Sequence, residues 1–429
     1  MDQVDSKKLI VNSDQGFESK NKKRVVHLQY GSSPSGNYVL RYHEAFLERG
    51  LDSCVLSLHS NVIGDPKIQR IGKKGVLIRK VNQRIQDFYT RNIDKDAGGF
   101  ALSLFGSDVT SHDWVKNADV VYVHWILGGF LSIDGLEKIA KLGKPMIMVM
   151  HDMWTITGGC FHSFDCQKFL SHCQNCPMFP GDKEKDLSYT QFEEKFKFYH
   201  NYDNLSFVAP SKWLFNLSKK GTLLKDKPVF RIPNPLDTDL FKPFEKKVAK
   251  KILNIDQYQY VISFGANKIT SPYKGWTYLM DALKDLKQRQ PNLNICLLIF
   301  GSGPNNEIQD SIPFPCKFMG FITDDYTTNL VYNASDVFVA PSLADNLPTT
   351  ILESLACGTP VVGFDVGGIP DMIDHLKNGY LAKYKDAIDL SHGLNYCLSN
   401  NLGGYLLPDF YKNVIVNQHL ALMQDAIKE

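Results

Sequence analysis

The stretch of sequence that decides the fold reads Ser335-Asp-Val-Phe-Val-Ala-Pro-Ser342-Leu-Ala-Asp345-Asn-Leu-Pro-Thr-Thr-Ile-Leu-Glu353-Ser-Leu-Ala-Cys-Gly358-Thr-Pro-Val-Val-Gly-Phe-Asp365-Val-Gly-Gly-Ile-Pro370. Its apolar runs at 337–340 and 361–364 predict two short strands. Between them, a polar loop leads into a helix that Thr349 and Thr350 open and that stops at Gly358. Strands alternating with helices in this way are typical of a parallel α/β sheet.

The chemistry of this stretch is concentrated in its loop and helix. Asp345 lies in the loop, and Glu353 follows about two helical turns later. The free N–H groups at the start of the helix, near Thr349, are suited to binding an anion. Gly367 and Gly368 are expected to allow a close backbone approach to a ligand.

The rest of the chain repeats the same plan in two halves. In the first half, strands are predicted at 25–30, 53–58, 120–124, 146–150, 206–209 and 229–232. In the second half they are predicted at 260–264, 295–300, 318–321, 337–340 and 361–364. The two prolines of Ile232-Pro-Asn-Pro-Leu-Asp237 mark the boundary. The predicted fold is α/β, with two doubly wound Rossmann-like domains that face each other across a ligand cleft.

The predicted domain organisation has four parts. A polar leader covers residues 1–22, an N-terminal Rossmann-like domain covers 23–236, and a C-terminal Rossmann-like domain covers 237–405. A helix within 406–429 is expected to pack back on the N-terminal domain. A length of 429 residues is consistent with two domains, each able to bury a core.

Composition excludes several classes of protein. The hydrophobic fraction is 43% and the net charge is +2, which is globular and unlike a nucleic-acid coat protein. The chain has no apolar run near the ~20 residues that span a bilayer and no secretory signal. We therefore expect a cytoplasmic protein with reduced thiols and no nucleic-acid partner.

The charge is distributed unevenly. Up to Asn234 there are 32 Lys and Arg against 25 Asp and Glu, a net of +7, which leaves 16 against 21, a net of −5. Much of the excess lies between Lys67 and Lys95, where apolar residues such as Leu77, Val81 and Phe88 are interleaved. This segment is either a basic amphipathic helix for an anionic membrane face or an ordinary solvated helix.

The Asp345-x7-Glu353 pair and its continuation Ala356-Cys-Gly-Thr-Pro-Val-Val362 resemble the retaining, sugar-nucleotide-dependent glycosyltransferases of family 4, which have the GT-B architecture. The first acid of that family is usually Glu, so Asp345 is shorter by one methylene. The resemblance implies a hexosyltransferase that uses a UDP- or GDP-sugar and needs no cofactor for catalysis. It also implies that Asp345 contacts the donor sugar and that Glu353 holds the ribose hydroxyls with its acceptor oxygens.

The resemblance extends to other positions. Lys274, before Gly275, matches the lysine that neutralises the donor diphosphate, and Lys268 is the candidate for a second charge because no Arg follows Gly265. His151, at the end of a strand, matches a histidine close to the reacting sugar, and His124 is a weaker candidate. The loop from Gly31 to Gly36 is expected to line the acceptor or phosphate side. The implied donor-binding residues are Gly265, Lys268, Lys274, Asn346, Leu347, Thr349 and Glu353.

The segment Met153-Trp-Thr-Ile-Thr-Gly-Gly159-Cys160 with Cys166, Cys173 and Cys176 resembles one branch of that family, associated with exopolysaccharide assembly of the colanic-acid type. This branch suggests a lipid-linked oligosaccharide acceptor in bacterial surface polysaccharide biosynthesis, and a peripheral contact with the inner face of the cytoplasmic membrane. The four cysteines are candidate ligands of a structural zinc ion. Buried thiols and a disulfide pair are the alternatives.

Three other classes compete with a transferase. A nicotinamide oxidoreductase is disfavoured because Gly301-Ser-Gly303 lacks the third glycine of the dinucleotide motif and lies mid-domain. A sugar-nucleotide epimerase or phosphorylase shares the two-domain plan. A non-catalytic sugar-nucleotide-binding protein is the third, and the change at Asp345 is compatible with it.

Overall fold

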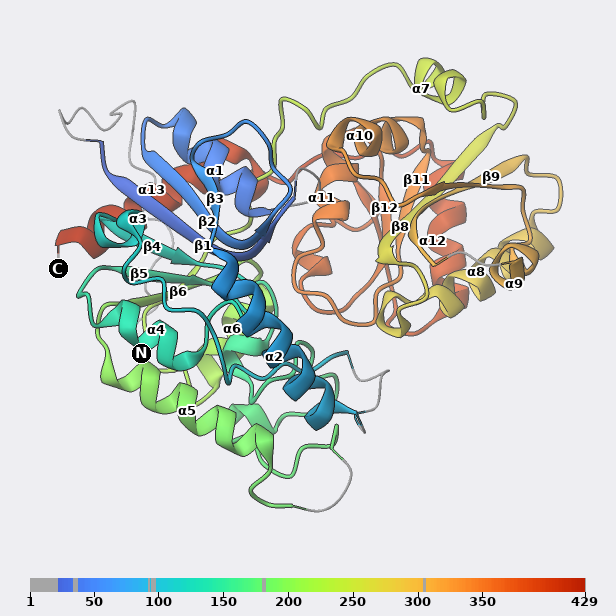
Figure 1. Cartoon of the computed structure of the whole chain (residues 1–429). Coiled ribbons are helices and arrows are strands. Elements are labelled where there is room, and N and C mark those ends of the chain that lie inside the picture. The colour runs from blue at the N-terminus through green and yellow to red at the C-terminus, as the bar shows by residue number, and fades with distance from the viewer. Residues whose placement is uncertain are drawn as a thin grey trace, which may run out of the picture.

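Two parallel sheets form the framework of the molecule, and Figure 1 shows them side by side. The structure is a computed structural model that describes residues 22–33, 38–91, 93, 98–179, 183–303 and 306–428. The predicted polar leader lies outside these residues except for Lys22.

The first sheet has seven strands in the order β3-β2-β1-β4-β5-β6-β7. Its strands are β1 (Arg24–Ser32), β2 (Asp52–Ser60), β3 (Ile68–Arg70), β4 (Val120–Val123), β5 (Met146–Val149), β6 (Leu205–Ala209) and β7 (Val229–Arg231). All neighbouring pairs are parallel. The order reverses at β1 and β4, which is the switch point where doubly wound sheets place their ligands.

The second sheet has six strands in the order β10-β9-β8-β11-β12-β13. Its strands are β8 (Tyr260–Lys268), β9 (Ile295–Ser302), β10 (Cys316–Gly320), β11 (Val337–Ala340), β12 (Val361–Phe364) and β13 (Gly379–Ala382). These pairs are also parallel. The predicted architecture of two Rossmann-like domains is therefore confirmed, with one sheet in each half of the chain.

Helices cover both faces of each sheet (Figure 1). In the first domain they are α1 (Tyr38–Glu48), α2 (Lys73–Thr90), α3 (Asp113–Lys116), α4 (Ile133–Ala140), α5 (Leu187–Asn201) and α6 (Lys212–Lys220). In the second half they are α7 (Lys246–Ile252), α8 (Trp276–Arg289), α9 (Asn306–Ser311), α10 (Asp325–Ala334), α11 (Thr349–Ala356), α12 (Ala387–Ser399) and α13 (Lys412–Lys428).

Strand β4 shows why the central strands are apolar throughout. Val120 and Tyr122 pack in the cluster formed with α1 and α13, whereas Val121 and Val123 pack in the cluster on the opposite face, with Leu136 of α4. Successive side chains of a strand point to opposite faces, so a strand covered on both faces has to be apolar at every position.

The strand predictions fail at three of the four sheet edges, whereas the edge strand β7 was predicted. Strands β3 and β13 are not predicted, and β10 begins at Cys316 rather than at Phe318. All three are edge strands with partly exposed residues. Because an edge strand is not buried on both faces, its sequence lacks the continuous apolar run on which the prediction depends.

Helix α13 returns to the first domain after the second is complete (Figure 1). Ile415, Val416 and Met423 of α13 are buried against the face of the sheet that α1 also covers. Within the described residues, no helix combines the length and apolar character required to cross a membrane.

Candidate functional site

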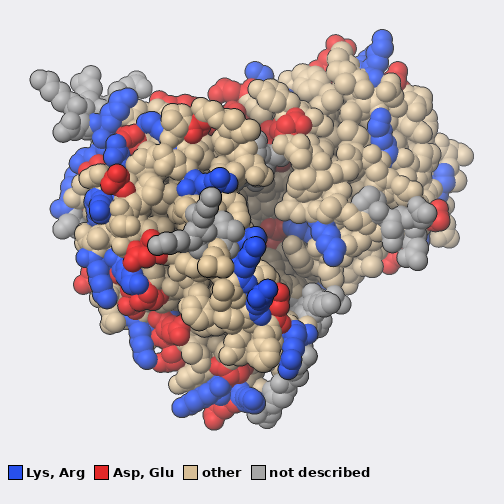
Figure 2. Space-filling view, in the orientation of Figure 1, with Lys and Arg blue, Asp and Glu red and all other residues tan. Residues whose placement is uncertain are grey.

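A cleft of about 610 Å³ lies between the two domains. Figure 2 shows the hollow, with basic side chains on both of its rims. From the first domain it is lined by Gln29, Ser33 and Tyr38; from the second by Gly265, Ala266, Asn267, Lys268, Ser271, Tyr273, Lys274, Phe300, Gly301, Phe321, Ile322, Asp325, Thr328, Asp345, Pro348, Thr349, Thr350 and Glu353. Most of these residues lie at the carboxyl ends of β8, β9 and β11 or in the segments that follow them, which is where α/β sheets bind ligands.

Lys274 and Asp345 meet in this cleft. The Lys274 Nζ lies 2.7 Å from Asp345 Oδ2, and both side chains are partly buried. Burial alone would lower the pKa of Lys274, but the negative charge of Asp345 raises it above its usual value, so the ammonium stays charged. The next residue, Gly275, has a φ of +71°, and a Cβ there would lie 1.8 Å from the carbonyl oxygen of Pro341. A glycine is therefore needed to bring Lys274 against the end of β11.

Glu353 lines the same cleft but is only 4% exposed. Its Oε1 accepts a hydrogen bond from Arg41 Nη2 at 2.7 Å, and its Oε2 accepts one from the Tyr332 hydroxyl at 3.0 Å. Arg41 belongs to α1 of the first domain. The acid predicted to hold the donor ribose is therefore held in place by two donors, one from each domain.

The helix that begins at Thr349 is observed as α11, and Pro348, Thr349 and Thr350 line the cleft at its amino-terminal end. Its free N–H groups supply positive electrostatic potential there. Leu347 is buried in the core of the second domain and is not among the described residues that line the cleft.

Asn346 joins the two domains rather than facing the cleft. Its side-chain amide donates to the carbonyl oxygens of Met150 and His151 at 3.0 and 3.2 Å and accepts from the Ser211 hydroxyl at 2.6 Å. The residue is 3% exposed.

Packing within the chain itself already requires Gly367 and Gly368, and their approach to a ligand stays a prediction. A Cβ on Gly367 would lie 2.1 Å from the carbonyl oxygen of Asp345, and one on Gly368 would lie 1.7 Å from that of Asn346. The glycine pair packs on the protein's own backbone and supports the loop that carries Asp345.

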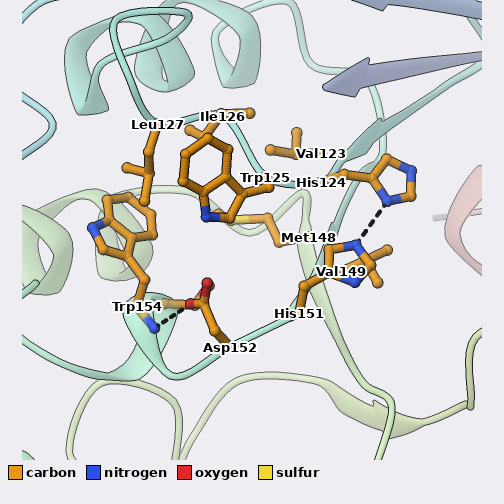
Figure 3. A pocket seen from close by; sticks show the side chains of 11 residues that line it. Val123, His124, Trp125, Ile126, Leu127, Met148, Val149, His151, Asp152 and Trp154 are labelled. Atoms are coloured by element: carbon orange, nitrogen blue, oxygen red, sulfur yellow. Dashed lines mark hydrogen bonds between the residues drawn. The ribbon is translucent and has the colours of Figure 1, made fainter. Parts of the chain in front are cut away.

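His151 and His124 lie beside the cleft, around a small cavity of about 20 Å³ that Figure 3 shows. His124 Nδ1 lies 3.1 Å from His151 Nε2, and His124 Nε2 lies 3.0 Å from His27 Nδ1. Burial lowers the pKa of His151 to about 3 and holds that of His124 well below its usual range, so both rings are neutral near pH 7. The His151 ring stacks on Tyr38 at a centroid distance of 3.6 Å, and Tyr38 in turn lines the cleft.

The remaining predicted positions are distributed around this site. Gly265 and Lys268 line the cleft. Gly31 lies near the end of β1, beside the cleft-lining residues Gln29 and Ser33, but is not among the described residues that line the cleft. Gly36 lies outside the described residues.

The four clustered cysteines surround one cavity of about 20 Å³, which is lined by Cys160, Cys166, Cys173 and Cys176 together with Phe100 and Lys168. All four are free thiols. Burial raises the pKa of Cys160 and of Cys173 to about 12. Across the described parts of the chain, no three His, Cys, Asp or Glu side chains are grouped so that they could hold a metal ion. The zinc site stays a prediction from the sequence.

Of the site residues that were not predicted, three make contacts that bear on its chemistry. Arg41 contacts Glu353, and Tyr38 covers His151. The third, His162, is half-buried, with its ring 5.4 Å from that of Tyr273, and the charges of Asp345 and Lys274 act on it. The position of His162, two residues after Cys160 in an unusual segment, was the only available signal.

Comparison with known proteins gives independent information on the second domain. Residues 259–400 match the family model described as "Glycosyl transferases group 1". The match covers most of the second domain and none of the first. An uncharacterized glycosyltransferase of Haemophilus influenzae is 28% identical over 139 residues, which cover 30% of this chain and 37% of that protein. The aligned segments of this and the next curated relative span less than half of those proteins' own length.

Solved structures resemble the whole chain. A glycosyltransferase from Rickettsia africae has a TM-score of 0.60 at 14% identity, covering 95% of this chain and all of that one. The Anabaena protein HepE, in complex with UDP and glucose, has a TM-score of 0.58 at 14% identity, covering 94% of this chain and all of that one. The chain thus has the GT-B fold, and its residues 259–400 carry the group 1 glycosyltransferase sequence family.

Proposed function

We propose that this protein is a retaining glycosyltransferase. It would transfer a hexosyl group from a UDP- or GDP-sugar to a hydroxyl of a lipid-linked glycan, in the biosynthesis of a bacterial surface polysaccharide. The observation that carries the proposal is the interdomain cleft in which Lys274, Asp345, Glu353 and the start of α11 come together. The family match of the second domain supports transferase chemistry, and the HepE structure with UDP and glucose supports a nucleotide-sugar donor.

The donor would bind mainly to the second domain. Lys274 and the N–H groups at Thr349 would face the diphosphate, because both provide positive charge or potential on the lining of the cleft. Lys268 is a second cation on that lining. Glu353 would accept hydrogen bonds from the ribose hydroxyls, and Asp345 from the hydroxyls of the sugar.

The reaction breaks the bond between the anomeric carbon and the phosphate oxygen and forms a bond from that carbon to the acceptor oxygen. The electron pair of the broken bond leaves with the nucleoside diphosphate, whose charge Lys274 would stabilise. The proton of the acceptor hydroxyl passes to a phosphate oxygen of the leaving group on the same face, so the configuration is retained. No separate base is needed, which agrees with a neutral, buried His151.

His151 would act through position rather than charge. Its carbonyl oxygen is fixed by Asn346 at 3.2 Å, and its ring is stacked on Tyr38, which faces the cleft. With a pKa near 3, the ring cannot donate a proton as imidazolium at neutral pH. Its backbone and ring edge would orient the sugar.

Helix α2 is the proposed contact with an anionic membrane. Leu77 and Phe88 are 66% and 59% exposed, and Val81 between them is also exposed. Their spacing of four and seven residues places them on one face of the helix. Arg79, Lys80 and Arg84 line a surface hollow on the same helix. The side chains of Lys73, Lys74 and Val76, and Lys95, lie outside the described residues.

The decisive experiment is nucleotide release from a panel of UDP- and GDP-sugars, with and without a lipid-linked glycan acceptor. We expect nucleotide release from one donor, and this release should increase when the acceptor is added. NMR of the product should show the same anomeric configuration as the sugar had in the donor. If a nucleotide sugar raises the melting temperature but is never cleaved, the protein is a non-catalytic nucleotide-sugar-binding protein. Conversion of the sugar without acceptor would instead indicate an epimerase.

A further inference from the structure

We propose that Arg41 is a positioning residue of the donor site. From the first domain it holds the carboxylate of Glu353, in the second domain, in the orientation that accepts the two ribose hydroxyls. The inference rests on the proposed function, because it assigns Glu353 to the ribose of a nucleotide donor.

The contact is buried and crosses the domain boundary. Arg41 Nη2 lies 2.7 Å from Glu353 Oε1 and 3.2 Å from Asp325 Oδ2, and the side chains of Arg41 and Glu353 are each 5% exposed. The guanidinium carbon also lies 5.2 Å from the centre of the Phe241 ring. Arg41 is thus enclosed by residues of the second half of the chain, although it belongs to α1.

The geometry leaves Glu353 able to bind a diol. An ionised carboxylate has about four acceptor sites on its two oxygens, and Arg41 and Tyr332 use one on each. Because Glu353 lines the cleft, its remaining acceptor sites are available to a ligand there. Charge-assisted hydrogen bonds are short and directional, so the two donors restrict rotation of the carboxylate and leave one free acceptor on each oxygen.

Arg41 also compensates charge. Without it, Glu353 and Asp325 would face the same buried space with no shared cation, and an uncompensated buried carboxylate is strongly unfavourable. Tyr332 is neutral and cannot replace the guanidinium. The placement of Arg41 therefore matters for the ionised, acceptor-only form of Glu353 that a diol requires.

A further observation concerns the unused donors of Arg41. Its Nε and Nη1 are buried and have no hydrogen-bond partner among the described residues. Arg41 is not among the described residues that line the cleft, so its effect on a bound molecule passes through Glu353. The side chain is far more buried than is usual for arginine, and it is held there by the two acids and by the Phe241 ring.

The test measures binding of UDP, 2′-deoxy-UDP and inorganic pyrophosphate by calorimetry to the full chain, using the corresponding GDP compounds if guanine proves to be the preferred base. In Arg41→Met, affinity for the ribonucleotide is expected to fall roughly 10–100-fold, which is the effect of losing a hydrogen bond to a charged group. Affinity for pyrophosphate should stay within about twofold, since pyrophosphate has no diol. The substitution should lower the affinity for the deoxynucleotide less than the affinity for the ribonucleotide.

Two further variants keep the test decisive if Arg41→Met unfolds. Arg41→Lys preserves the charge and should recover part of the affinity for the ribonucleotide. Glu353→Gln should lower this affinity as much as Arg41→Met does, and the double variant should show no further loss of affinity. Arg49→Met, at the residue that follows the same helix, is the matched control and should bind like the wild type. In turnover, the change should fall on the donor KM more than on kcat.

The failure of this inference is distinguishable from failure of the proposed function. If no nucleotide binds even the wild type, the proposed function is wrong. If the wild type binds UDP or GDP but Arg41→Met, folded by its melting curve, binds it equally well, the positioning role is overturned. An equal loss of affinity for the nucleotide and for pyrophosphate would also overturn the positioning role, because that pattern indicates a general disturbance of the cleft.

Discussion

The ammonium of Lys274 and the carboxylate of Asp345 form a partly buried ion pair, with 2.7 Å between Nζ and Oδ2, on the lining of the interdomain cleft. In this state, the cation assigned to the donor diphosphate is paired with the acid assigned to the donor sugar. A bound donor would bring phosphate oxygens to the ammonium of Lys274 and sugar hydroxyl groups to the carboxylate of Asp345. The pair thus holds both side chains in place before the donor arrives and raises the pKa of Lys274, which keeps its ammonium charged.

Removal of the cation should impair chemistry more than folding. We expect Lys274→Ala to lower kcat about 10²–10³-fold, which is the usual effect of losing one group that stabilises the developing charge. The measurement is nucleotide release at saturating donor. Lys284→Ala, which removes an exposed lysine of α8, is the control. Near-normal turnover in Lys274→Ala would contradict its role at the diphosphate.

The interdomain amide of Asn346 should matter for stability. Asn346→Ala leaves the buried carbonyl oxygens of Met150 and His151 without their donor, at a cost of about 1–3 kcal/mol. For domains of this size, that lowers the melting temperature by several degrees. Asn294→Ala, which removes an exposed amide bonded to the Gln257 carbonyl, should have little effect. An unchanged melting temperature would mean that the amide does not hold the domains together.

Buried histidines should make the protein sensitive to acid. Burial lowers the pKa of His419 to about 3, against about 6.5 in the unfolded chain. Its contribution to stability is therefore complete above pH 6.5 and is lost as pH falls toward 3, because only the unfolded state takes up the proton in that window.

The variant His419→Phe, on α13, should flatten this dependence. The slope of the free energy of unfolding against pH should decrease by up to about 1.4 kcal/mol per pH unit between pH 4 and 6. Denaturant titrations at several pH values measure it. His392→Phe, at an exposed position of α12, should leave the slope unchanged. An identical slope in His419→Phe would show that this ring already takes up a proton in the folded protein.

Metal analysis decides the four-cysteine prediction. If Cys160, Cys166, Cys173 and Cys176 bind structural zinc, protein purified without chelator should contain one zinc per chain, and Cys166→Ser should reduce that content. Cys316→Ser, far along the chain in β10, is the control. Absence of stoichiometric zinc would refute the prediction, and mass spectrometry would then identify free thiols or a disulfide.

Vesicle binding tests the proposed role of α2. Sedimentation with anionic vesicles should detect binding that weakens as salt rises, because the Debye length falls from about 10 Å at 0.1 M to about 3 Å at 1 M. Replacing Leu77 and Phe88 with Asp should abolish it. Val248→Asp, an exposed apolar position of α7, should not. Binding that is absent in the wild type or indifferent to salt would remove the membrane contact from the proposal.

The two-domain fold could be predicted because the central strands are buried on both faces. Val120–Val123 and Met146–Val149 are apolar at every position for that reason, and the turns after them are marked by polar residues. Strands β3 and β13 escaped prediction because they lie at sheet edges and carry partly exposed residues.

The candidate site was predictable where its residues are close in sequence. Asp345, Thr349 and Glu353 lie within one loop and helix, and Lys274 is marked by the glycine that follows it. His162 and Tyr38 were missed because neither stands in a pattern of its own. His162 packs against Tyr273 of the second domain, a contact that only the folded chain brings about.

The sequence by itself therefore determined the strand and helix pattern, the loop and helix that carry the two acids, and the lysine before the tight turn. These depend on local periodicity and on single-residue conformational preferences, which a linear chain displays directly. Only the tertiary structure decided that Arg41 is the partner of Glu353, 312 residues away, and that Asn346 binds the opposite domain. Such contacts depend on how two separately formed sheets face each other, and no local pattern in the chain encodes that orientation.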